Sequence, residues 1–208
     1  MAATPVDVLR TGIARADRVL IVLAGPNGAG KSTFFDAFLA PMGIRFVSAD
    51  LIARALAPDN PAAIAYVAAD VAAEERRRLM AEGVSFCMET VFSDPVGDKL
   101  RFLQDAQEAG YTVFLVFIGI DNPELAVARV IQRVEDGGHD VPDVKIRGRF
   151  PRTIVNLQQA APFVDFAYLF DNSSYDEPYR LVAAFERGRM IRRAAVLPAW
   201  AGGISAMK

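Results

Sequence analysis

The chain has 208 residues, a length that predicts one domain with room for a lid. Apolar residues make up 52% of it, which is enough for one buried core and excludes a largely disordered protein. The formal net charge is −2, so no overall positive field would draw the chain onto nucleic acid or an anionic membrane. We therefore expect neither nucleic acid nor a membrane as a partner.

The cysteine count and the first residues bear on where the protein works. Cys87 is the only cysteine, which excludes an internal disulfide framework and a cysteine-rich metal site. The first apolar run, residues 19–24, is far shorter than a secretory or membrane-spanning segment, and charged residues precede it. We expect a cytoplasmic protein.

Short apolar runs rich in Val, Ile and Phe alternate with longer segments of helical period. This order is typical of an α/β fold in which helices flank a mostly parallel sheet. Five runs are predicted as strands, at residues 19–24, 44–48, 84–88, 112–118 and 166–170. Because ligands of open parallel sheets bind at the carboxyl ends of the strands, functional residues are expected there.

A capping residue followed by proline marks most of the predicted helix starts. The pairs are Asn60-Pro61, Asp94-Pro95, Asn122-Pro123 and Val141-Pro142. Elsewhere, Glu74 and Arg78 lie four residues apart, which predicts an ion pair on a solvated helix face. The tail around Trp200 is expected to pack back onto the body. No repeat or linker divides the chain, so we expect one domain over residues 1–208.

The most specific motif is G-x-x-x-x-G-K-[ST], or Walker A, which follows the first predicted strand and precedes a helical segment. Its residues are Gly25, Pro26, Asn27, Gly28, Ala29, Gly30, Lys31, Ser32 and Thr33. Glycine permits positive φ, so backbone N–H groups of this loop can converge on phosphate oxygens. Lys31 would reach the β- and γ-phosphates of ATP, and the Ser32 hydroxyl would be a ligand of Mg²⁺. The alternative, a glycine-rich turn with an incidental lysine, is expected in on the order of one per cent of such chains.

Motifs that are missing narrow the class of P-loop protein. The chain has no LSGGQ-like transporter signature and no N-K-x-D guanine motif. Asp94-Pro-Val-Gly97 matches the D-x-x-G pattern of GTPases only through two common residues. The length also leaves little room for the extra domains of motors or transporters, so small phosphotransferases are the main class that remains.

Carboxylates follow the second and third predicted strands. Asp50 is placed to accept the proton of a substrate hydroxyl, and the alternative is that it only caps the next helix. Glu89 is a candidate to bind the acceptor or, through water, the metal, and Thr90 is a candidate to fix the acceptor. An exposed strand end is the alternative for this pair.

A basic segment follows the fourth predicted strand. Arg129 and Arg133 lie four apart on one predicted helix, and Arg149, Arg152 and Asn156 share a face of the next. Such helices are expected to form a mobile lid that closes cations over phosphates, because the guanidinium group grips phosphate with two hydrogen bonds. An ordinary basic surface is the alternative.

The two lid helices are separated by Gly137-Gly138 and by His139, the only histidine. The lid as a whole is predicted at about residues 124–160. A histidine in a turn is more often structural or solvated than catalytic, so no role is assigned to His139.

Several of these segments occur together in a characteristic order. They are Gly25 to Thr33, Phe46-Val-Ser-Ala-Asp-Leu-Ile-Ala53, Glu89-Thr90, Arg129-Val-Ile-Gln-Arg-Val134, Gly137-Gly-His-Asp-Val-Pro142, Arg149-Phe150 and Asn156-Leu157. The set, which runs from about Leu20 to Ser173, resembles the zeta toxin family, and above all its short branch, often labelled predicted ABC-type ATPases.

The resemblance implies a P-loop kinase fold and ATP-dependent phosphorylation of a sugar hydroxyl, best known for UDP-N-acetylglucosamine. Toxic members of the family are held in check by an antitoxin. Lys31 matches the P-loop lysine, Asp50 the general base, and Glu89 with Thr90 the acceptor-binding strand end. The two γ-phosphate arginines are matched best by Arg133 and Arg149, and the competing residues are Arg129, Arg147 and Arg152.

The chain departs from the best-studied toxins in being short, in its Gly-Gly-His-Asp-Val-Pro turn and in lacking their longer acceptor-binding insertions. The resemblance therefore carries kinase activity over more directly than the acceptor. The expected function is transfer of the ATP γ-phosphate to a hydroxyl of a nucleotide sugar or a similar metabolite. The alternative is a P-loop ATPase switch or binding module without phosphotransfer.

Overall fold

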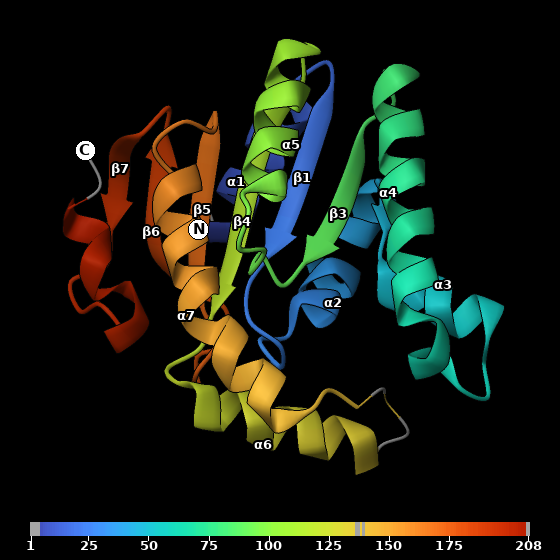
Figure 1. The fold of residues 1–208 in the computed structure, drawn as a ribbon. Helices are drawn as coiled ribbons and strands as arrows, with labels where there is room; N and C mark the ends of the chain where they lie inside the picture. Colours follow the sequence, from blue (N-terminus) through green and yellow to red (C-terminus); the bar gives the residue numbers. More distant parts are fainter. Residues whose placement is uncertain (1–4, 136–137, 139, 207–208) are drawn as a thin grey trace.

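The computed structural model describes residues 5–135, 138 and 140–206 (Figure 1). Its central sheet has seven strands in the order β2-β3-β1-β4-β5-β6-β7. Strands β1 to β5 are parallel, whereas β6 and β7 are added to β5 in antiparallel fashion. The predicted α/β class with a mostly parallel sheet is confirmed, but the predicted number of five strands was wrong because the sheet continues beyond β5.

The parallel strands begin and end within two residues of the predicted apolar runs, and the largest offset is at β3, which was predicted at residues 84–88. The seven strands are β1 (Val19–Ala24), β2 (Arg45–Val47), β3 (Phe86–Thr90), β4 (Thr112–Gly119), β5 (Phe166–Asp171), β6 (Arg180–Glu186) and β7 (Arg189–Arg193). β7 was not predicted because an exposed edge strand needs few apolar residues, and this one consists mostly of arginine.

The helices pack on both faces of the sheet (Figure 1). They are α1 (Pro5–Ala14), α2 (Lys31–Phe34), α3 (Ala49–Leu56), α4 (Ala65–Ala81), α5 (Asp98–Glu108), α6 (Pro123–Glu135) and α7 (Asp143–Ala160). Shorter turns are the π-helical Phe35–Leu39 and the 3-10 helices Ala40–Met42, Pro61–Ile64 and Ala199–Ala206. None of the helices within the described ranges combines the length and apolar content needed to cross a bilayer.

The predicted helix starts were right at three of the four prolines. At Pro61 a 3-10 helix begins with Asn60 as its N-cap, and it leads into α4 at Ala65. α6 begins at Pro123, with the Asn122 side chain accepting a hydrogen bond from the backbone N–H of Leu125 at 2.9 Å. α7 begins directly after Pro142. The start expected at Asp94-Pro95 was wrong, because the chain first turns through Gly97 at φ 79° and α5 begins at Asp98.

The helix pair predicted between Glu74 and Arg78 was also wrong. Arg78 instead pairs with Glu75 at 2.9 Å and with Glu82 at 2.7 Å, one helical turn to either side. The neighbouring Arg76 is buried, and its guanidinium lies 5.9 Å from the ring centre of Phe102. The charged run on α4 is therefore solvated on one side only.

The core consists of two apolar layers, one on each face of the sheet. Alternate residues of β1 enter the two layers, Leu20 and Val22 on one side and Ile21 and Leu23 on the other, and all four are fully buried. Helices α4, α5 and α7 cover the first layer, and α1, α2 and α6 cover the second. Each such side chain contributes roughly 1.5–3 kcal/mol to folding, so β1 and the loop that follows it rest on the most buried part of the molecule.

The tail packs back onto the sheet, as expected. Trp200 is buried and donates a hydrogen bond from Nε1 to the Asp171 carboxylate at the end of β5, at 3.0 Å. Its indole ring fills the space beside Gly119, where a Cβ atom would come within 2.2 Å of the ring. The C-terminal segment thus closes the carboxyl edge of β4 and β5.

Candidate functional site

The loop between β1 and α2 can be built only with glycine at three positions, Gly25, Gly28 and Gly30, and the first and last of these show why. Gly25 has φ 146°, and a Cβ atom there would lie 2.2 Å from the carbonyl oxygen of Ile118. Gly30 has φ 88°, and its Cβ would lie 2.7 Å from Nδ2 of Asn172 and 2.9 Å from the hydroxyl of Tyr179. Any other residue would be strained and would collide at both places.

Two side chains from the far end of the chain hold the loop in this shape. Asn172 donates a hydrogen bond to the carbonyl of Ala29 at 2.9 Å, and the Tyr179 hydroxyl donates one to the carbonyl of Gly30 at 2.9 Å. In a trans peptide the N–H points opposite to its carbonyl, so the N–H groups of Gly30 and Lys31 point away from these two partners. Backbone N–H groups of such a loop, when their carbonyls are held by other partners, are suited to bind phosphate oxygens.

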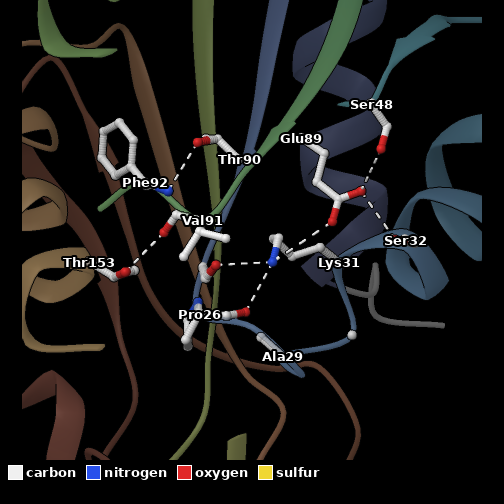
Figure 2. A network of polar contacts seen from close by, with 12 residues as sticks. Pro26, Ala29, Lys31, Ser32, Ser48, Glu89, Thr90, Val91, Phe92 and Thr153 are labelled. Atoms are coloured by element: carbon white, nitrogen blue, oxygen red, sulfur yellow. Dashed lines mark hydrogen bonds and ion pairs between the residues drawn. The ribbon is translucent and has the colours of Figure 1, made fainter. Parts of the chain in front are cut away.

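Lys31 lies folded against the loop (Figure 2). Its ammonium group is buried and donates to the carbonyls of Gly25 and Pro26, each at 3.0 Å, with a carboxylate oxygen of Glu89 at 3.8 Å. Burial lowers the pKa of Lys31 from its ordinary value, and the nearby negative charges of Glu89 and Asp50 oppose that shift. A bound phosphate would take the place of the two carbonyl partners.

Glu89 connects the loop to the neighbouring strands. It accepts hydrogen bonds from the hydroxyls of Ser32 at 3.1 Å and of Ser48 at 3.5 Å, besides its ion pair with Lys31 (Figure 2). The next residue, Thr90, accepts a hydrogen bond from the backbone N–H of Phe92 at 3.0 Å. The residue pair is therefore built into the polar network and is not simply an exposed strand end.

Asp50 lies in the first turn of α3, and the N-cap position of that helix is taken by Ser48. The Asp50 side chain is exposed, and its charge acts on Lys31. It lines a small hollow between α3 and the turn before α4, together with Ala49, Ala53, Pro61 and Ala65. The arrangement leaves the carboxylate open to a molecule that enters from this side.

Three of the five candidate arginines are engaged elsewhere. Arg129 donates to the carbonyl of Asn172 at 2.7 Å, and its guanidinium lies 5.2 Å from the ring centre of Tyr175. Arg147 forms ion pairs with Asp143 and Glu124. Arg152 donates to the carbonyl of Ser93 at 3.0 Å.

Arg133 and Arg149 are the two arginines matched to the γ-phosphate. Arg133 lies close enough to the loop for its charge to lower the pKa of Lys31. Arg149 is half-buried on α7, and its side chain makes no hydrogen bond or ion pair with the part of the chain that the structure describes. His139 lies outside the described residues.

Two oxygen donors beside the loop fit Mg²⁺. The Ser32 hydroxyl and a carboxylate oxygen of Glu89 lie 3.1 Å apart beside the loop, and both are hard oxygen donors of the kind that Mg²⁺ prefers. Within residues 5–135, 138 and 140–206, no group of three or more His, Cys, Asp or Glu side chains could hold a metal by itself.

Sequence reasoning missed the residues that hold the loop. Asn172 and Tyr179 lie 143 and 149 residues from the carbonyls that they contact, so no local pattern could reveal them. Ser48, which contacts Glu89, was missed as well. Its only signal was its place as the last residue of a predicted strand.

Comparison with known proteins assigns the family. Residues 20–148 match a family model described as an AAA domain, which is more than half of the chain. The chain belongs to this AAA domain family. The match includes the loop with Lys31, Asp50, Glu89 and Arg133. An uncharacterized protein of Haemophilus influenzae is 29% identical over 130 residues, which cover 62% of this chain and 91% of that protein.

Solved structures similar to this AAA domain protein include kinase-like and toxin proteins. A putative kinase from Chloroflexus aurantiacus has a TM-score of 0.51 at 18% identity, over 65% of this chain and 78% of that one. The PezAT chromosomal toxin-antitoxin system of Streptococcus pneumoniae gives 0.59 at 16% identity, over 85% and 77%. AvrRxo1-ORF1:-ORF2 with ATP gives 0.61 at 16%, over 94% of this chain and only 65% of that one. At these identities the likeness establishes the fold, a P-loop kinase-like fold.

Proposed function

We propose that the protein is an ATP-dependent phosphotransferase of the zeta toxin type, which transfers the γ-phosphate to a hydroxyl of a small, nucleotide-like acceptor such as a nucleotide sugar. One observation carries the proposal. The buried ammonium of Lys31 lies 3.8 Å from a carboxylate oxygen of Glu89 at the end of β3, and it also feels the charge of Asp50, which follows the neighbouring strand β2. A cradle for phosphate and a candidate base thus lie at the same edge of the sheet.

Each group has a role in such a transfer. The loop N–H groups and Lys31 would bind the phosphates, and Ser32, with Glu89 through water, would hold Mg²⁺. The bound ion would supply neutralisation of charge on the phosphate oxygens. Asp50 would accept the proton of the acceptor hydroxyl. The oxygen of that hydroxyl would form the new bond to the γ-phosphorus as the bond between the γ-phosphorus and ADP breaks.

The remaining residues of the site would orient the reactants. Thr90 would fix the acceptor, and Arg133 and Arg149 would stabilise the charge that is redistributed over the γ-phosphoryl oxygens. The proposal treats residues 1–208 as one cytoplasmic domain whose lid, about residues 124–160, includes α6 and α7. The proposal includes an antitoxin as protein partner, because the similar PezAT structure is that of a toxin-antitoxin system.

Replacement of Asp50 tests the proposal. The protein is incubated with labelled ATP and either UDP-N-acetylglucosamine or a metabolite extract, and the phosphorylated product is identified by mass spectrometry. Asp50→Asn should lower transfer by about 10²- to 10⁴-fold while ATP binding is kept, because only the proton acceptor is lost. The matched control is Asp59→Asn, which changes another exposed aspartate close to the hollow.

A P-loop ATPase switch or binding module is the competing function. It would need the loop and Lys31 but not Asp50. Equal ATP turnover in the wild type and in Asp50→Asn, with no phosphorylated product from either, would favour that function. Lys31→Ala should remove nucleotide binding in both cases, and the exposed Lys145→Ala serves as its control.

A further inference from the structure

The segment that follows β3 is attached to α7 by its backbone. The carbonyl oxygen of every residue from 91 to 94 accepts a hydrogen bond from a side chain of α7. Thr153 donates to Val91 at 2.9 Å, and Arg152 donates to Ser93 at 3.0 Å. Asn156 uses both protons of its amide, one to Phe92 and one to Asp94, each at 3.0 Å.

Two of the three donors, Thr153 and Asn156, are buried, and the segment that they hold has an unusual backbone. Thr153 is fully buried and Asn156 is 7% exposed. Phe92 has φ 61°, a left-handed conformation that a bulky residue adopts only where its surroundings impose it. The segment therefore owes its shape to α7, and it begins directly after the candidate acceptor residues Glu89 and Thr90.

The same face of α7 carries a candidate γ-phosphate arginine. Arg149 precedes Thr153 by four residues and Asn156 by seven, so all three lie on one side of the helix. The Thr153 hydroxyl lies 3.1 Å from the carbonyl of Arg149 and 2.9 Å from that of Val91, and Figure 2 shows the second of these contacts. A shift of this helix face toward bound phosphate would move the segment with it.

We propose that Arg152, Thr153 and Asn156 are positioning residues that join α7 and residues 91–94 into one unit. The inference rests on the proposed function and deepens it. When nucleotide draws Arg149 toward its phosphates, the unit brings residues 91–94, which directly follow Glu89 and Thr90, into place beside the acceptor. Nucleotide binding thereby prepares the acceptor site.

Hydrogen-deuterium exchange of the full chain, with and without AMP-PNP and MgCl₂, tests the coupling. In the wild type the nucleotide should slow exchange in both α7 and residues 91–97. Thr153→Val keeps the shape of the side chain but removes the hydroxyl, and Asn156→Leu removes both amide donors. In each variant we expect α7 to respond to nucleotide as before, while residues 91–97 lose the response and exchange about tenfold faster, as expected for loss of one or two hydrogen bonds.

Controls separate positioning from general stability. Thr153→Ser should restore the response, and Thr11→Val, which removes an exposed hydroxyl that bonds only its own helix, should leave it intact. If the buried variants fail to fold, Arg152→Ala removes the bond to Ser93 from an exposed position. It should weaken the response of residues 91–97 without a change in melting temperature.

The outcomes also separate this inference from the proposed function. A nucleotide response in α7 but not in residues 91–97 of the wild type would overturn the inference, as would an equal response in Asn156→Leu and the wild type. Coupled exchange in a protein that phosphorylates no acceptor would refute the kinase and support the coupling. Absence of any response to AMP-PNP would overturn both.

Discussion

Substitution of Gly30 by alanine should destabilise the protein far more than the same change at Gly43. Both glycines have positive φ, 88° and 71°, so alanine at either position costs about 1 kcal/mol of backbone strain. At Gly43 nothing lies within 4 Å of the added methyl group. At Gly30 the methyl would come within 2.7 Å of the Asn172 amide and 2.9 Å of the Tyr179 hydroxyl.

The magnitude follows from the contacts that must give way. Asn172 and Tyr179 can move aside only by releasing the carbonyls of Ala29 and Gly30, and each lost hydrogen bond costs about 1 kcal/mol. Gly30→Ala should therefore lower the free energy of unfolding by about 2 kcal/mol more than Gly43→Ala does. For a chain of this size that difference corresponds to about 4–8 °C in melting temperature.

Urea unfolding followed by circular dichroism measures the free energies, and calorimetric titration with ATP measures binding. Gly30→Ala should lose ATP binding because the loop N–H groups are displaced, while Gly43→Ala should bind as the wild type does. Equal losses of stability in the two variants would refute the reasoning, since they would mean that Asn172 and Tyr179 do not pack against the loop as described.

Three further predictions concern the lid, the tail and the thiol. Arg133→Ala and Arg149→Ala should each lower kcat by about 10³-fold or more with a much smaller loss of ATP affinity, whereas Arg77→Ala on the exposed side of α4 should change neither in steady-state kinetics. Trp200→Phe keeps an aromatic ring but leaves its buried carboxylate partner without the indole N–H, which should cost about 1–3 kcal/mol in urea unfolding; a loss below 0.5 kcal/mol would contradict this. Burial raises the pKa of the Cys87 thiol, so above about pH 8.5 the unfolded chain releases a proton that the folded one keeps, and stability falls. Between about pH 8.5 and 10, stability should fall less steeply in Cys87→Ala than in the wild type, and equal slopes would show that the thiol does not contribute.

The parts of the fold that sequence could predict are those with a local cause. β1 and β4 are buried on both faces, so they appear as unbroken apolar runs. The motif from Gly25 to Thr33 was predictable because its glycines, lysine and hydroxyl are neighbours in the chain. Asp50 and Glu89 were found because each follows or ends an apolar run, where a parallel sheet places its ligands.

The parts that were missed depend on contacts between distant residues or on a choice between equivalent neighbours. Tyr179 lies 149 residues from the carbonyl it holds, and nothing around it in the sequence marks it. Arg78 has acidic residues at three spacings on α4, and the rotamer that it adopts favours Glu75 and Glu82 over Glu74. The sequence placed Arg152 and Asn156 on one face of a helix. It did not reveal that their side chains donate hydrogen bonds to the backbone carbonyls of residues 92–94.

The two outermost strands of the sheet also bear on how the protein behaves at high concentration. β2 has only three residues, and its Arg45 forms an ion pair with Glu75 of α4. β7, at the opposite margin, has arginine at positions 189, 192 and 193. A short edge strand and a positively charged edge strand are both poor templates for strand addition from a second molecule. The sheet can therefore keep two unpaired edges, at β2 and β7, and still resist the edge-to-edge association that leads to aggregation.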